Sequence, residues 1–212
     1  MNESASVATA IRTCLRSMTI AGKSGQSRLQ PSVIRALEEA GFIADKEDTK
    51  KFLHARVPVW RSKVDHAIVP TPGRRKIDIV VYTKSDRLVA LVETESDLGD
   101  LREHGVSSRS GHYDVASIAR NSDGHHFDSY NSLERMATAA FNYSVFVATK
   151  QWPTPAQGTA LLETIRSDAP SVHNPASVAM FLVSGQCRAM DKLILQRRLK
   201  SLNAKLLCAN DA

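Results

Sequence analysis

The fold of this chain is decided by two neighbouring stretches, Lys76-Ile77-Asp78-Ile79-Val80-Val81-Tyr82 and Leu88-Val89-Ala90-Leu91-Val92-Glu93-Thr94-Glu95. Both are rich in β-branched and apolar residues and are bounded by polar or turn-forming ones, so each is typical of a β-strand. The short polar segment between them favours an antiparallel hairpin. Because apolar residues fall on both faces of these strands, we expect helices to cover the sheet on both sides.

The length of the hairpin loop decides whether the acidic residues of the two strands meet. Side chains alternate between faces along a strand, and directly opposed residues share a face. A four-residue loop over 84–87, built around a type I turn, sets four opposed pairs: Thr83 with Leu88, Tyr82 with Val89, Val80 with Leu91, and Asp78 with Glu93. A five-residue loop would instead pair Asp78 with Val92 and separate the acids. We predict the four-residue loop.

Three carboxylates, those of Asp78, Glu93 and Glu95, then share one face among apolar strand residues. At about 4 Å two such charges repel by about 1 kcal/mol in water and by about 4 kcal/mol at an effective dielectric constant near 20. A divalent cation relieves this repulsion, and hard ions such as Mg2+ favour carboxylate and water ligands. The alternatives are protonation of one acid and separate solvation of all three at a frayed hairpin end. The shared face favours a metal site.

The order Ile77-Asp78, strand, turn, then Glu93-Thr94-Glu95 resembles the motif of the PD-(D/E)XK nuclease superfamily. It matches the variant in which a second glutamate replaces the lysine, as in some Type II restriction endonucleases, although Ile77 stands where the superfamily name has proline. The resemblance covers about 20 residues and its motif is short and degenerate. It implies that Asp78 and Glu93 hold Mg2+, for which Mn2+ can substitute. It also implies that Glu95 acts beside the attacking water, as base, second metal ligand or water-orienting group.

Hydrolysis of a DNA phosphodiester needs an activated water and a cation against the developing negative charge. We therefore expect a Mg2+-dependent, sequence-specific double-stranded DNA endonuclease, a Type II restriction enzyme. We expect it to act in the cytoplasm as a homodimer, since two-fold symmetry matches a palindromic site, and to have a cognate DNA methyltransferase as genetic partner. The alternatives are another PD-(D/E)XK nuclease acting in DNA repair or on branched DNA, and a non-catalytic DNA-binding protein whose acids are incidental.

The charge of the chain fits a polyanionic partner. Its 28 Lys and Arg outnumber its 22 Asp and Glu, which gives a formal net charge of +6 and a pI of about 9.4. The candidate DNA contacts precede the hairpin or lie in the glycine-punctuated stretch 98–128, and they are Arg74, Arg75, Lys76, Arg102, Arg109 and Arg120. Glu38, near the end of an early predicted helix, is a possible supporting acid, with a solvated surface role as the alternative. His125 and His126, with Asn131, are a second and less favoured candidate metal site.

The remaining pattern predicts a single nuclease domain over residues 1–212, with an N-terminal helical segment over about residues 1–45. The expected fold class is α/β, with a mixed central β-sheet flanked by helices on both faces, as in restriction endonucleases. Helices are predicted over Val7–Met18, Pro31–Gly41, from about Ser132, over Ala156–Arg166 and over Ala189–Leu207, and further strands over Tyr143–Thr149 and Ser177–Val183.

Two further expectations concern cysteines and membranes. Cys14, Cys187 and Cys208 are odd in number and widely spaced, which favours reduced thiols over a disulfide framework or a zinc site. The chain has no apolar run long enough to cross a bilayer, and Met1-Asn2-Glu3-Ser4 lacks the pattern of a secretion signal. We therefore expect no membrane partner.

Overall fold

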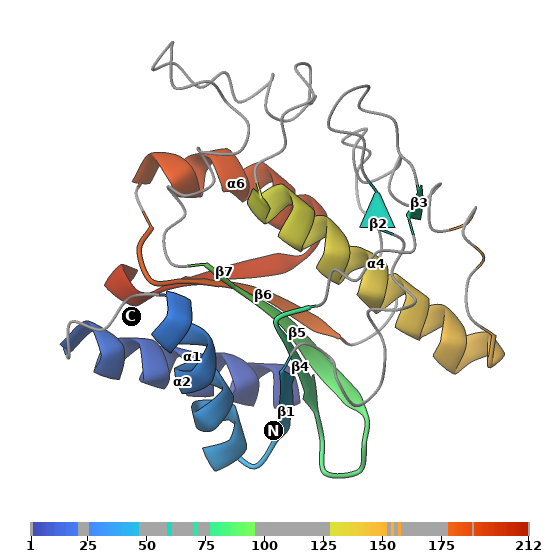
Figure 1. Ribbon diagram of the computed structural model, residues 1–212, viewed down its shortest axis with the longest axis horizontal. Coiled ribbons are helices and arrows are strands. Elements are labelled where there is room, and N and C mark those ends of the chain that lie inside the picture. Colours follow the sequence, from blue (N-terminus) through green and yellow to red (C-terminus); the bar gives the residue numbers. More distant parts are fainter. Residues whose placement is uncertain are drawn as a thin grey trace.

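The computed structural model describes residues 2–20, 26–46, 59–60, 70–71, 77–95, 128–151, 154, 157, 178–187 and 189–211 (Figure 1). Its centre is a five-stranded sheet in the order β1-β4-β5-β6-β7. The strands are β1 (Ile43–Lys46), β4 (Ile79–Tyr82), β5 (Leu88–Glu95), β6 (Ala179–Ser184) and β7 (Ala204–Cys208). A separate short sheet pairs β2 (Val59–Trp60) with β3 (Pro70–Thr71).

The central sheet is mixed. The strands β1, β4 and β5 form an antiparallel meander, whereas β6 and β7 continue the sheet in parallel with β5. Parallel neighbours need a crossover connection, and the helices α4 (Asp128–Thr149) and α6 (Ala189–Ser201) lie in those two connections. The predicted α/β class and mixed sheet are confirmed.

Helices cover both faces of the sheet (Figure 1). The helices α1 (Glu3–Ile20) and α2 (Gln26–Glu39) pack on one face, where Ile79, Val92 and Phe181 are buried. The helices α4 and α6 pack on the other, over a cluster that includes Val80 and Leu91. This alternation explains why all four residues of β4 are buried. Within the described residues, no helix has the length and apolar character needed to cross a bilayer.

The hairpin loop is one residue shorter than predicted. The N–H of Thr83 donates to the carbonyl of Arg87, and the N–H of Asp86 donates to the carbonyl of Thr83. Asp86 has a φ of 71°, in the left-handed region. This is a three-residue loop, a type I turn followed by a left-handed residue. Aspartate tolerates that conformation better than most side chains, because its short polar group can bond locally.

A β-bulge compensates for the shorter loop. Tyr82 pairs with Leu88 instead of the predicted Val89, and the register shifts between Val81 and Tyr82. The extra residue of β5 restores the pairing beyond the bulge, so Val80 pairs with Leu91 as predicted. The loop is one residue shorter than predicted and the bulge adds one residue to β5, so the two changes cancel. The pairing between the bulge and the acid-bearing end of the hairpin therefore has the predicted register.

Several predicted helix and strand limits are wrong, although the N-terminal helix is confirmed as α1. Helix α2 begins at Gln26, so Pro31 lies inside it instead of starting it. The predicted strand Tyr143–Thr149 is the last part of α4, whose start at Asp128 also places Asn131 inside the helix. The helix continues through residues whose propensity favours a strand, and of these Tyr143 packs against the cluster under α4 and α6.

Two strands lie where helix was predicted. The N-terminal segment contributes β1, and the last helix ends at Ser201, after which Ala204–Cys208 form β7. Asn203, with a φ of 53°, makes the turn between that helix and β7. The predicted strand near Ser177–Val183 is confirmed as β6. The predicted helix Ala156–Arg166 lies outside the described residues except for Gln157.

Cys187 and Cys208 form a disulfide, with their Cα atoms 5.9 Å apart, so the prediction of three reduced thiols is wrong. The two residues are brought together because β6 and β7 are parallel neighbours that end at the same edge. The side chain of Asn210 reinforces the link by accepting from the N–H of Cys187 and donating to its carbonyl. Cys14 is buried and free, and its burial, with a smaller effect of Glu39, raises the pKa of its thiol.

Candidate active site

Polar side chains gather at the edge where β5 and β6 end. Glu93 and Thr94 are each only 1% exposed, and Ser184 at the end of β6 is fully buried. Glu95 pairs with Ser184, and its carbonyl accepts a hydrogen bond from the N–H of Gly185. The carboxyl ends of parallel strands are the usual ligand-binding edge of an open α/β sheet. The acidic motif therefore lies where the fold favours a site.

Asp78 is tied to this edge through Thr94. It occupies a bend directly before β4. Its Oδ2 accepts two hydrogen bonds from Thr94, from the backbone N–H at 2.9 Å and from Oγ1 at 2.7 Å. The other oxygen, Oδ1, accepts no hydrogen bond from any residue in the described ranges. The carboxylate is thus anchored by one oxygen and can offer the other to a ligand.

Helix α2 also contacts the bend at Asp78. The Nε2 of Gln30 donates to the backbone carbonyl of Asp78 at 2.9 Å. The sequence pattern predicted no separate role for Gln30 or Thr94. The position of Thr94 inside the Glu93-Thr94-Glu95 motif was an available signal, whereas the contact of Gln30 joins residues 48 apart and has no local sequence signature.

The side chains of the three predicted acids do not all point the same way. Alternation along β5 places Glu93 and Glu95 on the face of Leu91, toward α4 and α6, whereas Thr94 faces α1 and α2. Because Thr94 binds Oδ2 of Asp78, the three acids do not gather into one group as predicted. Within the ranges that the structure describes, no three Asp, Glu, His or Cys side chains form a group that could hold a metal ion.

Asp78 and Glu93 lie one residue beyond the end of the described ladder, whose last pair is Ile79 with Val92. The hydrogen bonds from Thr94 keep Asp78 beside the end of β5 that carries Glu93. Glu95 lies two residues further along β5 and is partly exposed.

Glu38, the predicted supporting acid, lies further along α2 than the residue that contacts Asp78. Gln30 marks the part of α2 next to Asp78, and Glu38 is eight residues further along the helix, about 12 Å at 1.5 Å per residue. The chain then enters β1 at Ile43, which pairs with Tyr82 near the hairpin loop. Glu38 is therefore close to the opposite end of the strands.

The predicted DNA contacts and the rival histidine pair lie outside the described residues, and they are Arg74, Arg75, Lys76, Arg102, Arg109, Arg120, His125 and His126.

Thr94→Val is expected to destabilise the protein by about 1–2 kcal/mol, because it removes a hydroxyl that donates to a carboxylate without changing the shape of the side chain. Urea unfolding measures the change in free energy. Thr94→Ser, which keeps the hydroxyl, is the matched control and should lose much less. Equal losses in the two variants would contradict the proposed anchor.

Comparisons of the chain with protein-family models, with curated proteins and with solved structures gave no match. A function must therefore be argued from the chemistry of this corner and from the charge of the chain.

Proposed function

We propose that this protein is a Mg2+-dependent DNA endonuclease that hydrolyses phosphodiester bonds at specific sites, as the Type II restriction enzymes do that its motif resembles. One observation carries most of the proposal: Thr94 anchors Asp78 beside the end of β5 that carries Glu93 and Glu95, at the carboxyl edge of the parallel strands β5 and β6. The mixed sheet between helix layers is compatible with a restriction-endonuclease-like fold, which forms part of the proposal.

The available donors suit Mg2+. This ion usually keeps several waters and takes one or two carboxylates together with substrate phosphates, instead of an all-protein cage. A pair of acids is therefore sufficient, and Asp78 and Glu93 would hold the ion. Bound Mg2+ would supply positive charge against the transition state and lower the pKa of a bound water.

The residues around the acids have separate roles in this proposal. Thr94 and Gln30 position Asp78 by binding its carboxylate and its carbonyl. Glu95, which is partly exposed at the end of β5, orients the attacking water or accepts its proton. Mn2+ can replace Mg2+, since both accept oxygen ligands. A homodimer in the cytoplasm, with a DNA methyltransferase as genetic partner, completes the proposal.

Digestion of a sequenced plasmid tests this function. We expect discrete fragments in Mg2+ or Mn2+ and none in EDTA, with ends that map to a repeated short sequence. Cleavage confined to branched or flapped DNA would favour a repair nuclease instead. Binding of DNA without any nicking in either metal ion would contradict the endonuclease and favour a non-catalytic DNA-binding protein.

A further inference from the structure

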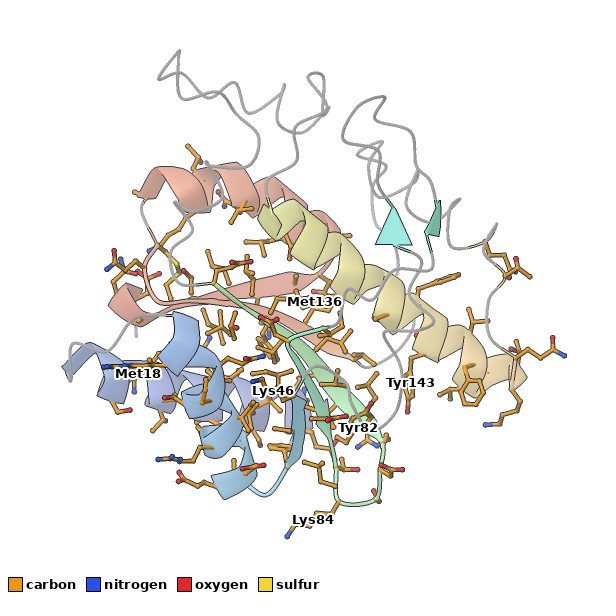
Figure 2. The ribbon with its side chains drawn as sticks, viewed as in Figure 1. Met18, Lys46, Tyr82, Lys84, Met136 and Tyr143 are labelled. Atoms are coloured by element: carbon orange, nitrogen blue, oxygen red, sulfur yellow. A yellow bond between two sulfur atoms is a disulfide. The ribbon has the colours of Figure 1, made fainter. Side chains whose placement is uncertain are left out.

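The disulfide lies at the same edge of the sheet as the candidate active site (Figure 2). Ser184, the last residue of β6, pairs with Glu95 on one side and with Cys208 on the other. Paired residues of neighbouring strands share a face of the sheet. Because neighbouring strands lie about 4.8 Å apart, the backbone of Cys208 stands roughly 10 Å from that of Glu95 in one row across the sheet.

A turn over residues 184–187 connects the disulfide to Glu95. The N–H of Gly185 donates to the carbonyl of Glu95 at 3.0 Å. The Oγ of Ser184 donates to the carbonyl of Gln186 at 2.7 Å and accepts from the N–H of the same residue at 3.3 Å. The last residue of the turn carries the disulfide. The turn is therefore held by β5 at its start and by β7 at its end.

A second link closes the same end of the turn without using sulfur. The side chain of Asn210 accepts from the N–H of Cys187 at 3.1 Å and donates to its carbonyl at 2.8 Å. These bonds keep Cys187 beside the end of β7 when the disulfide is open. Reduction therefore removes one of two links, and it leaves the two thiols close enough to be reoxidised.

A disulfide is unusual in the cytoplasm, where the proposed function places the protein. Thiols are kept reduced there, and the disulfides that do form are usually transient ones that catalyse or sense redox chemistry. Cys187 and Cys208 are each 3% exposed, so thiol exchange needs a local opening of this edge. Local openings cost less free energy than unfolding of the whole chain. The pair is therefore open to reduction without loss of the fold.

We propose that the redox state of Cys187 and Cys208 controls how firmly the turn holds Glu95, and through Glu95 the rate of the endonuclease. This inference rests on the proposed function and adds its regulation. A dithiol is the reductant: one of its thiolates attacks a sulfur of the pair, and its second thiol then displaces the protein. Two electrons and two protons pass to the cysteines, which become two thiols, while the dithiol becomes a disulfide. The opened turn then holds Glu95 less firmly beside the attacking water.

Initial rates of plasmid nicking in Mg2+ test the inference, in buffers of graded reduced and oxidised dithiothreitol. We expect the rate to fall roughly 10-fold on reduction, because displacements of about 1 Å are enough to disturb catalytic geometry. The midpoint of the fall should coincide with the midpoint of thiol formation, and reoxidation should restore the rate. The assays are run below the temperature at which circular dichroism detects unfolding of the reduced protein.

Cysteine variants show whether this pair is the site at which reductant acts. Cys187→Ser/Cys208→Ser should cut at the rate of the reduced wild type in every buffer. Cys14→Ser is the matched control and should respond to reductant as the wild type does, because Cys14 takes no part in the disulfide.

Hydrogen exchange reports on the turn directly and does not depend on cleavage. Exchange at the N–H of Gly185, which is bonded to Glu95, should become roughly 10-fold faster on reduction. The N–H of Thr83, which is bonded within the hairpin loop, is the internal control and should exchange at the same rate in both states.

The cleavage and exchange measurements separate the inference from the function on which it rests. If the wild type cuts equally fast in both states, or if reductant also slows the double variant, the inference is overturned and the endonuclease stands. A fall in rate without faster exchange at Gly185 also overturns it, because the turn is then not the route. If exchange responds but the wild type never cuts in Mg2+ or Mn2+, the link between the disulfide and this edge stands and the endonuclease fails.

Discussion

Glu93→Gln should lower the rate of DNA cleavage in Mg2+ by roughly 10³-fold or more, while DNA binding stays intact or becomes tighter. The substitution keeps the shape of the side chain but removes the charge that would hold the ion. Asp78→Asn should behave in the same way. Initial rates of plasmid nicking measure the loss, and anisotropy in EDTA measures binding separately. The result would link the acid pair directly to the chemistry.

Glu38→Gln is the matched control for this experiment. It removes a carboxylate from the same protein at an exposed position that the fold sets about 12 Å along α2 from Gln30. Its cleavage rate should equal that of the wild type. Calorimetry with Mn2+ gives a second readout, since uptake should vanish in Glu93→Gln and persist in Glu38→Gln. Full cleavage by either active-site variant would exclude the assignment of these acids.

Reduction of the Cys187–Cys208 disulfide should lower the free energy of unfolding by about 3 kcal/mol. The bond closes a loop with a sequence separation of 21 residues, and its loss returns that loop's conformational freedom to the unfolded chain. For a protein of this size the change corresponds to a fall in Tm of about 6–12 °C. Urea unfolding with and without dithiothreitol measures it.

The cysteine variants separate the disulfide from other effects of reductant. Cys187→Ser/Cys208→Ser should have the reduced stability and no further response to dithiothreitol. Cys14→Ser should keep the full response, because Cys14 takes no part in the bond. Thiol titration of the unreduced protein in denaturant should find one thiol of the three cysteines. Three titrating thiols, or a wild-type stability indifferent to reductant, would contradict the structure.

Local patterns predicted those parts of the fold that depend on neighbouring residues. The alternation along 77–95 identified both hairpin strands, and the spacing of Val7, Ile11, Leu15 and Met18 identified α1, because each pattern reports directly which side of an element is buried. The hairpin loop itself was mispredicted. The left-handed conformation of Asp86 and the bulge at Val89 changed the pairing near the loop, but their effects cancel before Asp78.

The candidate site, like the fold, was predictable from the sequence only in part. Asp78, Glu93 and Glu95 were found because acids are unusual inside apolar strands. Whether all three would gather into one group was not predictable, because the hydrogen bonds that Thr94 donates to Oδ2 of Asp78 depend on the folded structure. The sequence also does not reveal which end of α2 meets the bend at Asp78, so the place of Glu38 relative to that bend could not be predicted.

The two acid-bearing strands, the α/β class and the positive charge follow from side-chain type and short-range periodicity, so they can be read from the amino-acid sequence. Which distant residues meet depends on the folded chain. The tertiary structure brought Gln30 to Asp78, Cys187 to Cys208, and the first turn of α2 to the edge of the sheet. Contacts of this kind are set by how helices and crossovers pack on the sheet, a long-range property of the folded chain that no local stretch encodes.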